Sequence, residues 1–446
     1  MSGIFKAYDV RGLYQTELDE AAAYKIGYFL PKLLNSKSVL IGQDARKSSP
    51  SLFQSLRAGV LDAGADVLDL GLSTTPYVYF ATNHFKVDAS VQITASHNPK
   101  QYNGFKISTT NALPVGIDTG LADLEKMVET QEVVKAEKQG ECKKVDAKAD
   151  YLKFLSGFMT DFSKLNVAFD ASNGMSALFL KDMFKGANFN FLNCEIDGSF
   201  PAHSPNPLEA EAREQLSSFV VKNNCDFGAI FDGDADRVAF VDEKGQFIQP
   251  DYIISLIGKY YQQKGVTGHV ICDVRTSKST LSFIDGLGFQ SELWKVGHAF
   301  AKRKLREKNA VYGGELAGHY YFRDFGFCDS ALVACLVVMN ILAELKEKGI
   351  KLSDFMKTIV KYHNSGEVNF KCERKDEAIK AISEKYASGA NQKFDFDGIR
   401  YDMGSWWFSV RQSNTEPLLR LIVEADNKED FDKNFADLKE AIQKFC

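Results

Sequence analysis

The chain has 446 residues, of which 45% are hydrophobic and 25% charged, and its formal net charge is −5. This composition is typical of a soluble globular protein with about three or four domains. The net negative charge argues against a broad nucleic-acid-binding surface, but it leaves room for a local basic pocket that binds a small anion. The longest apolar run, Ala331 to Leu345, is interrupted by Asn340 and predicts a buried helix, because it is too short to span a bilayer.

The first residues contain no apolar signal core, so we expect a cytoplasmic protein that does not associate with membranes. Eight cysteines are scattered along the chain and none forms a C-x-x-C pair. Such a pattern favours reduced thiols in the core over a disulfide framework.

The first part of the chain alternates strand and helix patterns. We predict strands at 38–42, 65–70 and 89–93, with helices at 49–63 and 76–84 between them. The helix at 49–63 begins with Ser-Pro, which places a proline in its first turn. Alternation of this kind predicts a largely parallel sheet with helices on its faces.

The same pattern returns twice. Strand 165–170 leads into helix 175–184, and strand 269–273 leads into helix 278–284. Each series has an aspartate where a strand ends, namely Asp44, Asp170 and Asp273. An aspartate at that place also fits an ordinary helix N-cap. The repeated pattern predicts three related αβ domains in tandem.

Polar stretches at about 125–150, which we expect to be helix-rich, and near Gly366 mark seams between domains. Beyond Gly366 the composition changes to a strand, a helix, an aromatic β stretch around Trp406-Trp407-Phe408 and a charged amphipathic helix at 428–445. This last part is shorter than the preceding ones and is α+β in character.

A serine loop, Thr94-Ala95-Ser96-His97-Asn98-Pro99, follows the strand at 89–93. Pro99 cannot donate a backbone hydrogen bond and holds Asn98 extended, so the Ser96 hydroxyl is expected on a rigid loop. A nucleophile or a phosphate carrier needs such a fixed position. An ordinary polar turn explains the same residues. Lys106, on the far side of a predicted hairpin, would return to this loop.

A metal loop, Asp232-Gly233-Asp234-Ala235-Asp236-Arg237, separates two strand patterns. Three carboxylates at alternate positions repel one another, and a hard divalent cation would relieve this repulsion. Ligands that are all oxygen atoms favour Mg²⁺ over zinc. An EF-hand is excluded because strands, not helices, flank the loop. An acidic, solvated hairpin tip is the alternative.

Two further loops carry candidate binding groups. Arg411-Gln412-Ser413-Asn414-Thr415-Glu416-Pro417, with Arg420 shortly after, combines two guanidinium groups with hydroxyl and amide donors. This arrangement is suited to a phosphate dianion, although a surface turn with solvated arginines is the alternative. Gly313 to His319 places Glu315 and His319 among glycines, where they could bind sugar hydroxyls or belong to a glycine-rich turn. The basic helix that follows His298 is expected to be a solvated face.

Together these motifs resemble the α-D-phosphohexomutase family, and within it the bacterial phosphomannomutase and phosphoglucomutase group. The motifs are T-A-S-H-N-P, D-G-D-A-D-R, V-G-H, G-E-L-A-G-H and R-Q-S-N-T-E-P-L-L-R, preceded by F-K-A-Y-D-V-R-G at the start of the chain. They cover nearly the whole chain and keep the order seen in the family.

The resemblance implies an α/β fold with four domains around a central cleft, one motif from each. Three tandem, related αβ domains with mixed or parallel sheets would be followed by a smaller α+β C-terminal domain. We predict their bounds as 1–148, 149–246, 247–365 and 366–446.

The resemblance also implies roles for individual residues. Ser96 would be the phosphoserine, and Asp232, Asp234 and Asp236 would bind Mg²⁺ together with its phosphate, beside Arg237. Catalytic roles would fall to Lys106, Arg11 and His298. Contacts with substrate would come from Tyr8, Arg275, Glu315, Ala317, His319, Arg411, Ser413, Asn414, Thr415 and Arg420.

The implied reaction is reversible phosphoryl transfer between a hexose 6-phosphate and a hexose 1-phosphate. It would pass through phosphoserine and a hexose 1,6-bisphosphate, which also acts as activator. The expected partners are small-molecule hexose phosphates, and the expected assembly is a monomer or a small homo-oligomer.

Mannose is the expected sugar, with glucose as a second substrate, and a dedicated phosphoglucomutase is the alternative. Ala317 replaces a serine and Arg275 a lysine found in many relatives, so both bear on the hexose preference. Leu316 replaces the glutamine usual in phosphoglucosamine mutases.

Two other classes of function compete with a mutase. A non-catalytic sugar-phosphate-binding protein would not need the intact Ser96, aspartates and Lys106. A nucleotide-binding enzyme would need a P-loop or a dinucleotide fingerprint, and the sequence has neither.

Overall fold

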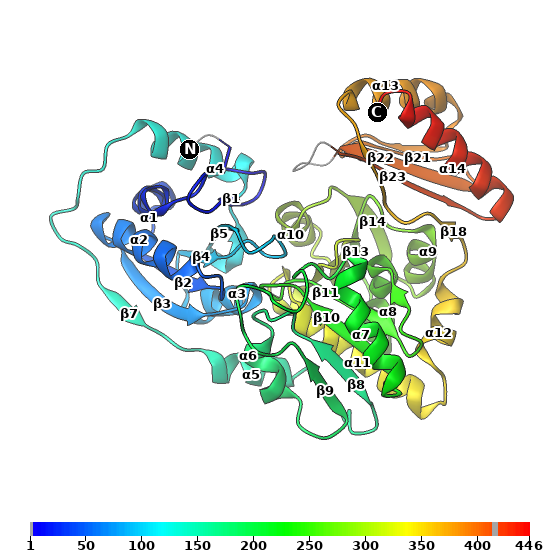
Figure 1. Ribbon diagram of the computed structural model, residues 1–446, viewed down its shortest axis with the longest axis horizontal. Helices are drawn as coiled ribbons and strands as arrows, with labels where there is room; N and C mark the ends of the chain where they lie inside the picture. The colour runs from blue at the N-terminus through cyan, green and yellow to red at the C-terminus, as the bar shows by residue number, and fades with distance from the viewer. Residues whose placement is uncertain (1–2, 413–417) are drawn as a thin grey trace.

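Four β-sheets organise the part of the chain that the computed structural model describes, residues 3–412 and 418–446. Figure 1 shows three of them gathered together, while the fourth, drawn in orange and red, stands apart at the upper right. The predicted fold class is confirmed: mixed αβ sheets come first, and a separate, smaller α+β domain comes last.

The first sheet has the strand order β1-β5-β4-β2-β3-β7, with β6 beside β5. Its central strands β3, β2 and β4 are parallel, as predicted, and β5 and β1 extend the sheet in antiparallel fashion. The strands are β1 (Val10–Leu13), β2 (Ser38–Gln43), β3 (Asp66–Leu72), β4 (Ala89–Ile93), β5 (Tyr102–Thr109), β6 (Leu113–Pro114) and β7 (Cys142–Lys144). The helices are α1 (Glu20–Leu34), α2 (Ser49–Asp62), α3 (Thr75–Phe85) and α4 (Leu121–Thr130).

The second sheet has the order β12-β11-β10-β8-β9. β9, β8 and β10 are parallel, whereas β10 and β11 form an antiparallel hairpin. The strands are β8 (Val167–Asp170), β9 (Phe189–Leu192), β10 (Phe227–Phe231), β11 (Val238–Asp242) and β12 (Phe247–Ile248). The helices are α5 (Lys148–Ser156), α6 (Ala177–Met183) and α7 (Ala210–Lys222).

The third sheet has the order β14-β13-β15-β16-β17. Its strands are β13 (His269–Asp273), β14 (Gln290–Trp294), β15 (Tyr312–Gly314), β16 (Tyr320–Phe322) and β17 (Cys328–Asp329). Its helices are α8 (Pro250–Gln263), α9 (Lys278–Gly286), α10 (His298–Glu307), α11 (Ala331–Glu347) and α12 (Leu352–Ile359). α11 is buried along most of its length, as its apolar sequence predicted. Within the described ranges, no helix combines the length and apolar character needed to cross a membrane.

The fourth sheet is antiparallel, with the order β18-β23-β22-β21-β20 and β19 beside β23. Its strands are β18 (His363–Asn364), β19 (Val368–Lys371), β20 (Gln392–Phe394), β21 (Ile399–Asp402), β22 (Trp406–Gln412) and β23 (Leu418–Ala425). Its helices are α13 (Lys375–Tyr386) and α14 (Lys428–Gln443). Short 3₁₀ turns elsewhere are η1 (Thr110–Ala112), η2 (Ile117–Thr119), η3 (Arg323–Phe325) and η4 (Ala387–Gly389).

The hydrophobic core is distributed unequally among the four domains. One large cluster runs through the first three domains and includes Tyr77, Phe169 and Tyr312. The fourth domain has its own cluster, and a small group of Leu316, Trp407 and Ile422 joins it to the third domain. Because apolar burial is the main stabilising term in folding, we regard the first three domains as one packed body.

The repeat of strand-exit aspartates is a structural repeat as well. Asp44, Asp170 and Asp273 each accept a hydrogen bond from the backbone N–H two residues later, at 3.0, 2.9 and 2.7 Å. All three aspartates are buried. The same turn therefore follows a central strand in each of the three αβ domains.

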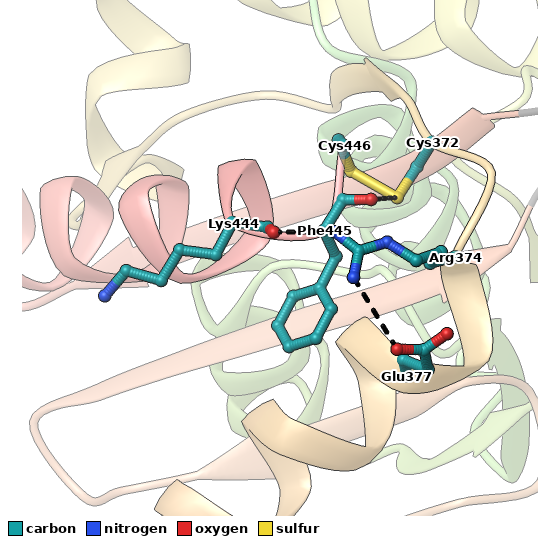
Figure 2. Close-up of a disulfide and its surroundings, with 6 residues drawn as sticks. All are labelled: Cys372, Arg374, Glu377, Lys444, Phe445 and Cys446. Carbon is teal, nitrogen blue, oxygen red and sulfur yellow. Dashed lines mark hydrogen bonds and ion pairs between the residues drawn. A yellow bond between two sulfur atoms is a disulfide. The ribbon is translucent and has the colours of Figure 1, made fainter.

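One disulfide corrects the expectation that all cysteines are reduced. Cys372 and Cys446 are bonded, with their Cα atoms 4.3 Å apart (Figure 2). The bond links the chain beyond α14 to the residue after β19. The two residues are 74 positions apart, and the packing of the fourth domain brings them together, which the spacing of cysteines could not reveal.

The seam at 125–150 also differs from the expectation. After α4 the chain has no helix until α5 and instead adds the short strand β7 at the edge of the first sheet. Lysine and glutamate have good helix propensity, but this segment lacks the apolar stripe that would hold a helix against the core.

Candidate active site

Ser96 follows β4 and is almost completely buried, at 1% exposure. Its backbone is left-handed, with φ of 50°, and its N–H donates to the Thr94 hydroxyl at 2.9 Å. A non-glycine residue in this conformation carries strain and persists only where its surroundings hold it. The Ser96 hydroxyl donates to Asp232 Oδ2 at 2.8 Å. The serine loop and the metal loop therefore meet directly.

Arg46 holds the serine loop in place, and the sequence analysis missed it. Its side chain is completely buried and pairs with Asp44 at 3.0 Å. Its two terminal nitrogens donate at 2.7 to 3.2 Å to four backbone carbonyls of the loop and the strand that follows, those of Ser96, Asn98, Pro99 and Tyr102. The signal in the sequence was slight: an arginine two residues after a repeated strand-exit aspartate.

His97 is not placed as a partner base for the serine. Its Nδ1 lies 3.4 Å from Ser96 Oγ, farther than Asp232 Oδ2. Burial, with nearby Arg237 and Arg11, lowers the pKa of His97 well below its usual range. Asn98 has a different task, since its Oδ1 accepts a hydrogen bond from Arg11 at 2.8 Å.

The metal loop is the turn of the β10–β11 hairpin, but it is not a solvated tip. Asp232, Asp234 and Asp236 are all at most 1% exposed, and one oxygen from each lies within 4.8 Å of the others. Burial and the two neighbouring carboxylates raise the pKa of Asp232 well above its usual range. Asp234 Oδ1 and Asp236 Oδ1 are buried without a hydrogen-bond partner. Three buried carboxylates this close together, two of them with an oxygen that lacks a hydrogen bond, fit a hard divalent cation.

Lys106 reaches this loop from β5. The β4–β5 hairpin pairs it with Gln92, and its amine contacts Asp234 at 2.7 Å and also Asp236. Burial alone would lower the pKa of the Lys106 amine, but the aspartates raise it above its usual range. Lys106 thus carries a positive charge beside the serine and the carboxylates.

Arg11 and Tyr8 approach from the first strand. β1 pairs with β5, and Gly104 permits this because a Cβ there would lie 2.0 Å from the Val10 carbonyl oxygen. Arg11 also forms an ion pair with Asp9. Tyr8 packs edge-on against His298, with 4.9 Å between ring centroids. These contacts bring the first and third domains together beside the serine loop.

The sugar loop joins β15 to β16 and touches the metal loop. Arg237 Nε donates to His319 Nε2 at 2.9 Å, and a backbone bridge links the same two residues. Glu315 is buried and accepts from the Tyr321 hydroxyl at 2.7 Å. Burial raises the pKa of Glu315. Ala317, at the tip of the turn, is partly exposed.

The basic helix α10 is not the solvated face that we expected. Lys302 is completely buried, 2.7 Å from Asp329 Oδ1 and above the Tyr79 ring. Asp329 Oδ2 in turn lies 2.7 Å from His319 Nδ1. His298 is buried with neither ring nitrogen hydrogen-bonded. Burial, with Lys302 nearby, lowers the pKa of His298 well below its usual range, so the ring is neutral.

The arginines of the fourth domain are held by acidic residues that the sequence analysis did not identify. Arg411 pairs with Asp397 at 2.7 Å, and Asp397 also accepts the Val296 N–H from the third domain. Glu367 contacts Arg420 at 3.3 Å and Arg275 at 3.1 Å. Ser413, Asn414 and Thr415 lie outside the described residues.

Four family models match the chain in order. They are the phosphoglucomutase/phosphomannomutase alpha/beta/alpha domain I at residues 2–134, domain II at 149–245, domain III at 249–362 and the C-terminal domain at 367–441. A phosphomannomutase of Escherichia coli strain K12 is 36% identical over 436 residues, which cover 94% of each chain. The chain belongs to the phosphoglucomutase/phosphomannomutase family. The protein is therefore an isomerase, a hexose phosphate mutase, while its exact domain bounds stay a prediction.

Solved structures agree with this membership. A phosphoglucomutase/phosphomannomutase family protein from Burkholderia thailandensis superposes with a TM-score of 0.89 at 28% identity, covering 99% of this chain and 97% of that one. Aspergillus fumigatus N-acetylphosphoglucosamine mutase, in complex with GlcNAc-6P and magnesium, has a TM-score of 0.61 at 13% identity, covering 98% and 95%. The second comparison shows the shared fold alone.

Proposed function

We propose that this mutase interconverts mannose 6-phosphate and mannose 1-phosphate, with glucose phosphates as a second substrate pair. The observation that carries the mechanism is the hydrogen bond from Ser96 to Asp232, at the edge of a buried group of three carboxylates that Lys106 offsets only in part. The name of the Escherichia coli relative supports mannose. A dedicated phosphoglucomutase is the second candidate, because Ala317 and Arg275 are departures that bear on the sugar.

We also propose that Asp232, Asp234 and Asp236 hold Mg²⁺. The unpartnered oxygens of Asp234 and Asp236 and the raised pKa of Asp232 support this assignment. When bound, the ion would offset charge on the transferring phosphoryl group and orient it. Asp232 contacts the Ser96 hydroxyl, so a phosphate on Ser96 would lie beside all three carboxylates.

Phosphorylated Ser96 would donate its phosphoryl group to the free hydroxyl of a bound hexose phosphate. The hydroxyl oxygen bonds to phosphorus, the bond from phosphorus to Ser96 Oγ breaks, and the hydroxyl proton leaves. The resulting hexose 1,6-bisphosphate then returns its other phosphate to Ser96. Lys106, which contacts the metal loop, and Arg11, which contacts the serine loop, would offset negative charge. His298 has free ring nitrogens that suit it to receive the proton.

The remaining side chains would orient the substrate. Glu315 and His319 suit the sugar hydroxyls, and Tyr8 and Ala317 border the same place. The phosphate that does not react would bind Arg275, Arg411, Arg420 and the donors Ser413, Asn414 and Thr415. A single cradle of this kind can hold either phosphate, so one site serves both half-reactions.

A coupled assay tests the choice of sugar. Mannose, glucose and glucosamine 1-phosphates would be compared, each with a trace of the matching 1,6-bisphosphate. We expect the highest kcat/KM for mannose 1-phosphate and measurable turnover of glucose 1-phosphate. A kcat/KM for glucose that exceeds that for mannose would favour the dedicated phosphoglucomutase.

Intact mass measurement tests the phosphate carrier. Wild-type protein incubated with hexose 1,6-bisphosphate should gain one phosphoryl group, and Ser96→Ala should gain none and lose turnover. Thr94→Ser, on the same loop, keeps the hydroxyl that accepts from Ser96 N–H and serves as the control. Full mutase activity in Ser96→Ala would remove Ser96 from the mechanism.

A further inference from the structure

Thr75 lies in the first domain but binds the middle aspartate of the metal loop in the second. It is the first residue of α3, which Figure 1 shows at the centre of the molecule, and its side chain is completely buried. Its N–H donates to the Asp234 carbonyl at 3.0 Å, and its hydroxyl donates to Asp234 Oδ2. Thr75 thus binds both the backbone carbonyl and the carboxylate of Asp234.

The two oxygens of the Asp234 carboxylate have different surroundings. Oδ2 accepts from Thr75 and from the Lys106 amine, whereas Oδ1 is buried with no partner. A carboxylate held by donors on one oxygen presents the other in a fixed direction. Asp234 itself belongs to the group of three carboxylates that offer one oxygen each within 4.8 Å of the others.

We infer that Thr75 is a positioning residue for the metal site: it orients Asp234 so that Oδ1 faces the divalent cation. The inference rests on the proposed Mg²⁺ site. Lys106 also touches Asp234 Oδ2, but its amine is shared with Asp236 and sits on a flexible side chain. Thr75 is short, lies at the start of a helix, and binds Asp234 through both its backbone N–H and its side-chain hydroxyl. Side chains that orient metal ligands in this way typically change metal affinity by about 10- to 100-fold when they are removed.

Thr74 offers a matched control. It is also completely buried and immediately precedes Thr75, but its hydroxyl oxygen caps α3 by accepting the Tyr77 N–H at 3.0 Å. Thr74→Val and Thr75→Val are the same near-isosteric change, one residue apart on the same helix end. Loss of the cap should lower the melting temperature without changing the orientation of the Asp234 carboxylate.

Calorimetric titration of the full chain with Mg²⁺, without sugar phosphate, tests the inference. The samples are wild type, Thr75→Val, Thr75→Ser, Thr74→Val and Asp234→Asn, all brought to one phosphorylation state that intact mass verifies. We expect Thr75→Val to weaken Mg²⁺ binding about 10- to 100-fold. Thr75→Ser keeps the hydroxyl and should stay within about threefold of wild type, and Thr74→Val should bind as wild type does.

Kinetics provide a second readout. In Thr75→Val the Mg²⁺ concentration that gives half-maximal turnover should rise, while KM for the hexose phosphate at saturating Mg²⁺ should not. If Thr75→Val does not fold, Thr75→Ala deletes the same hydroxyl without introducing a second methyl group and replaces it in both measurements.

The outcomes separate the inference from the proposed site. Wild-type Mg²⁺ affinity in Thr75→Val, with binding lost in Asp234→Asn, would overturn the role of Thr75 and leave the metal loop intact. Equal weakening in Thr74→Val and Thr75→Val would also overturn it, because the effect would then follow helix stability. Unchanged binding in Asp234→Asn would contradict the proposed metal site itself.

Discussion

The seam between the first and second domains and the seam between the third and fourth domains are built from different contacts. At the first seam, buried donors and acceptors join the reacting loops, as in the bond from Ser96 to Asp232 and the bonds from Thr75 to Asp234. The large hydrophobic core continues across it. At the second seam the shared apolar group is small, and the connection is made by ion pairs such as Lys278–Asp402 and by buried bonds from the Arg400 guanidinium to backbone carbonyls of the third domain.

This difference matches the demands on each region. The proposed phosphoryl transfer needs the serine, the carboxylates and the lysine at fixed distances, which a buried and densely hydrogen-bonded seam provides. A domain that holds the other phosphate must admit and release a substrate. The apolar group that joins the fourth domain to the third is small, so we expect the fourth domain to move more easily than the serine loop and the metal loop.

Asp251→Asn, at the second seam, should have the largest effect, which we expect on the pH dependence of stability. Asp251 is buried at the start of α8, accepts the Ser277 N–H, and lies near Glu424 of the fourth domain. Burial, with Glu424 and Asp273 nearby, raises the pKa of Asp251 from 3.8 to about 7. A raised carboxylate pKa means that the folded state holds a proton that the unfolded state releases, so stability falls as pH rises from about 4 to about 7.

The asparagine variant lacks this titration. The difference in free energy of unfolding, variant minus wild type, should therefore shift in favour of the variant between pH 4 and 8, by on the order of 4 kcal/mol. Urea-induced unfolding, followed through the transition in which the third domain unfolds, measures this difference. Asp150→Asn, at an exposed carboxylate, is the control. A difference that stays constant across this pH range would mean that Asp251 is ionised in the folded protein.

Arg46→Lys alters the support of the serine loop, which forms part of the first seam. Its effect should be the second largest. Lysine keeps the charge but cannot place donors on Asp44 and four carbonyls at once. We expect kcat to fall about 100-fold, equivalent to about 2.7 kcal/mol, with KM for the hexose phosphate nearly unchanged. Arg57→Lys, on α2 of the same domain, is the matched control. A kcat within twofold of wild type in Arg46→Lys would show that the serine loop holds its conformation without the guanidinium.

Arg411→Gln, in the fourth domain, should have the smallest effect of the three substitutions. Removing one charge-assisted contact to the non-reacting phosphate should raise KM about tenfold, with a smaller change in kcat. Arg374→Gln, near the disulfide in Figure 2, removes an arginine that contacts the Lys444 carbonyl and Glu377 and should leave KM unchanged. A loss confined to kcat in Arg411→Gln would move this residue from the phosphate cradle to the reacting centre.

Much of the fold and of the site could be predicted because its chemistry is local in sequence. Asp232, Asp234 and Asp236 stand two residues apart on one turn, so their side chains must lie close together in any fold that keeps this hairpin. Ser96 follows a strand that is predicted from its apolar residues. The helix at 49–63 was likewise predicted close to its observed bounds, Ser49–Asp62, because Ser-Pro marks its first turn.

The residues that were missed act across long separations. Arg46 lies 50 residues from Ser96 and Thr75 lies 159 from Asp234, and neither stands in a distinctive motif. Lys302 was predicted to be solvated because its helix is rich in basic residues, yet Asp329 compensates its charge inside the protein. A buried charge is acceptable only with its partner, and a sequence does not show which residue that partner is.

By itself, therefore, the sequence determined the candidate functional loops, the order of the domains and the family to which the chain belongs, since these depend on neighbouring residues and on periodicity. Only the tertiary structure decided what holds those loops together: the guanidinium of Arg46, the hydroxyl of Thr75 and the acidic links of Glu367 and Asp397. Such contacts depend on how distant segments and separate domains pack, and the packing follows from the whole buried surface, with no single stretch of chain that records it.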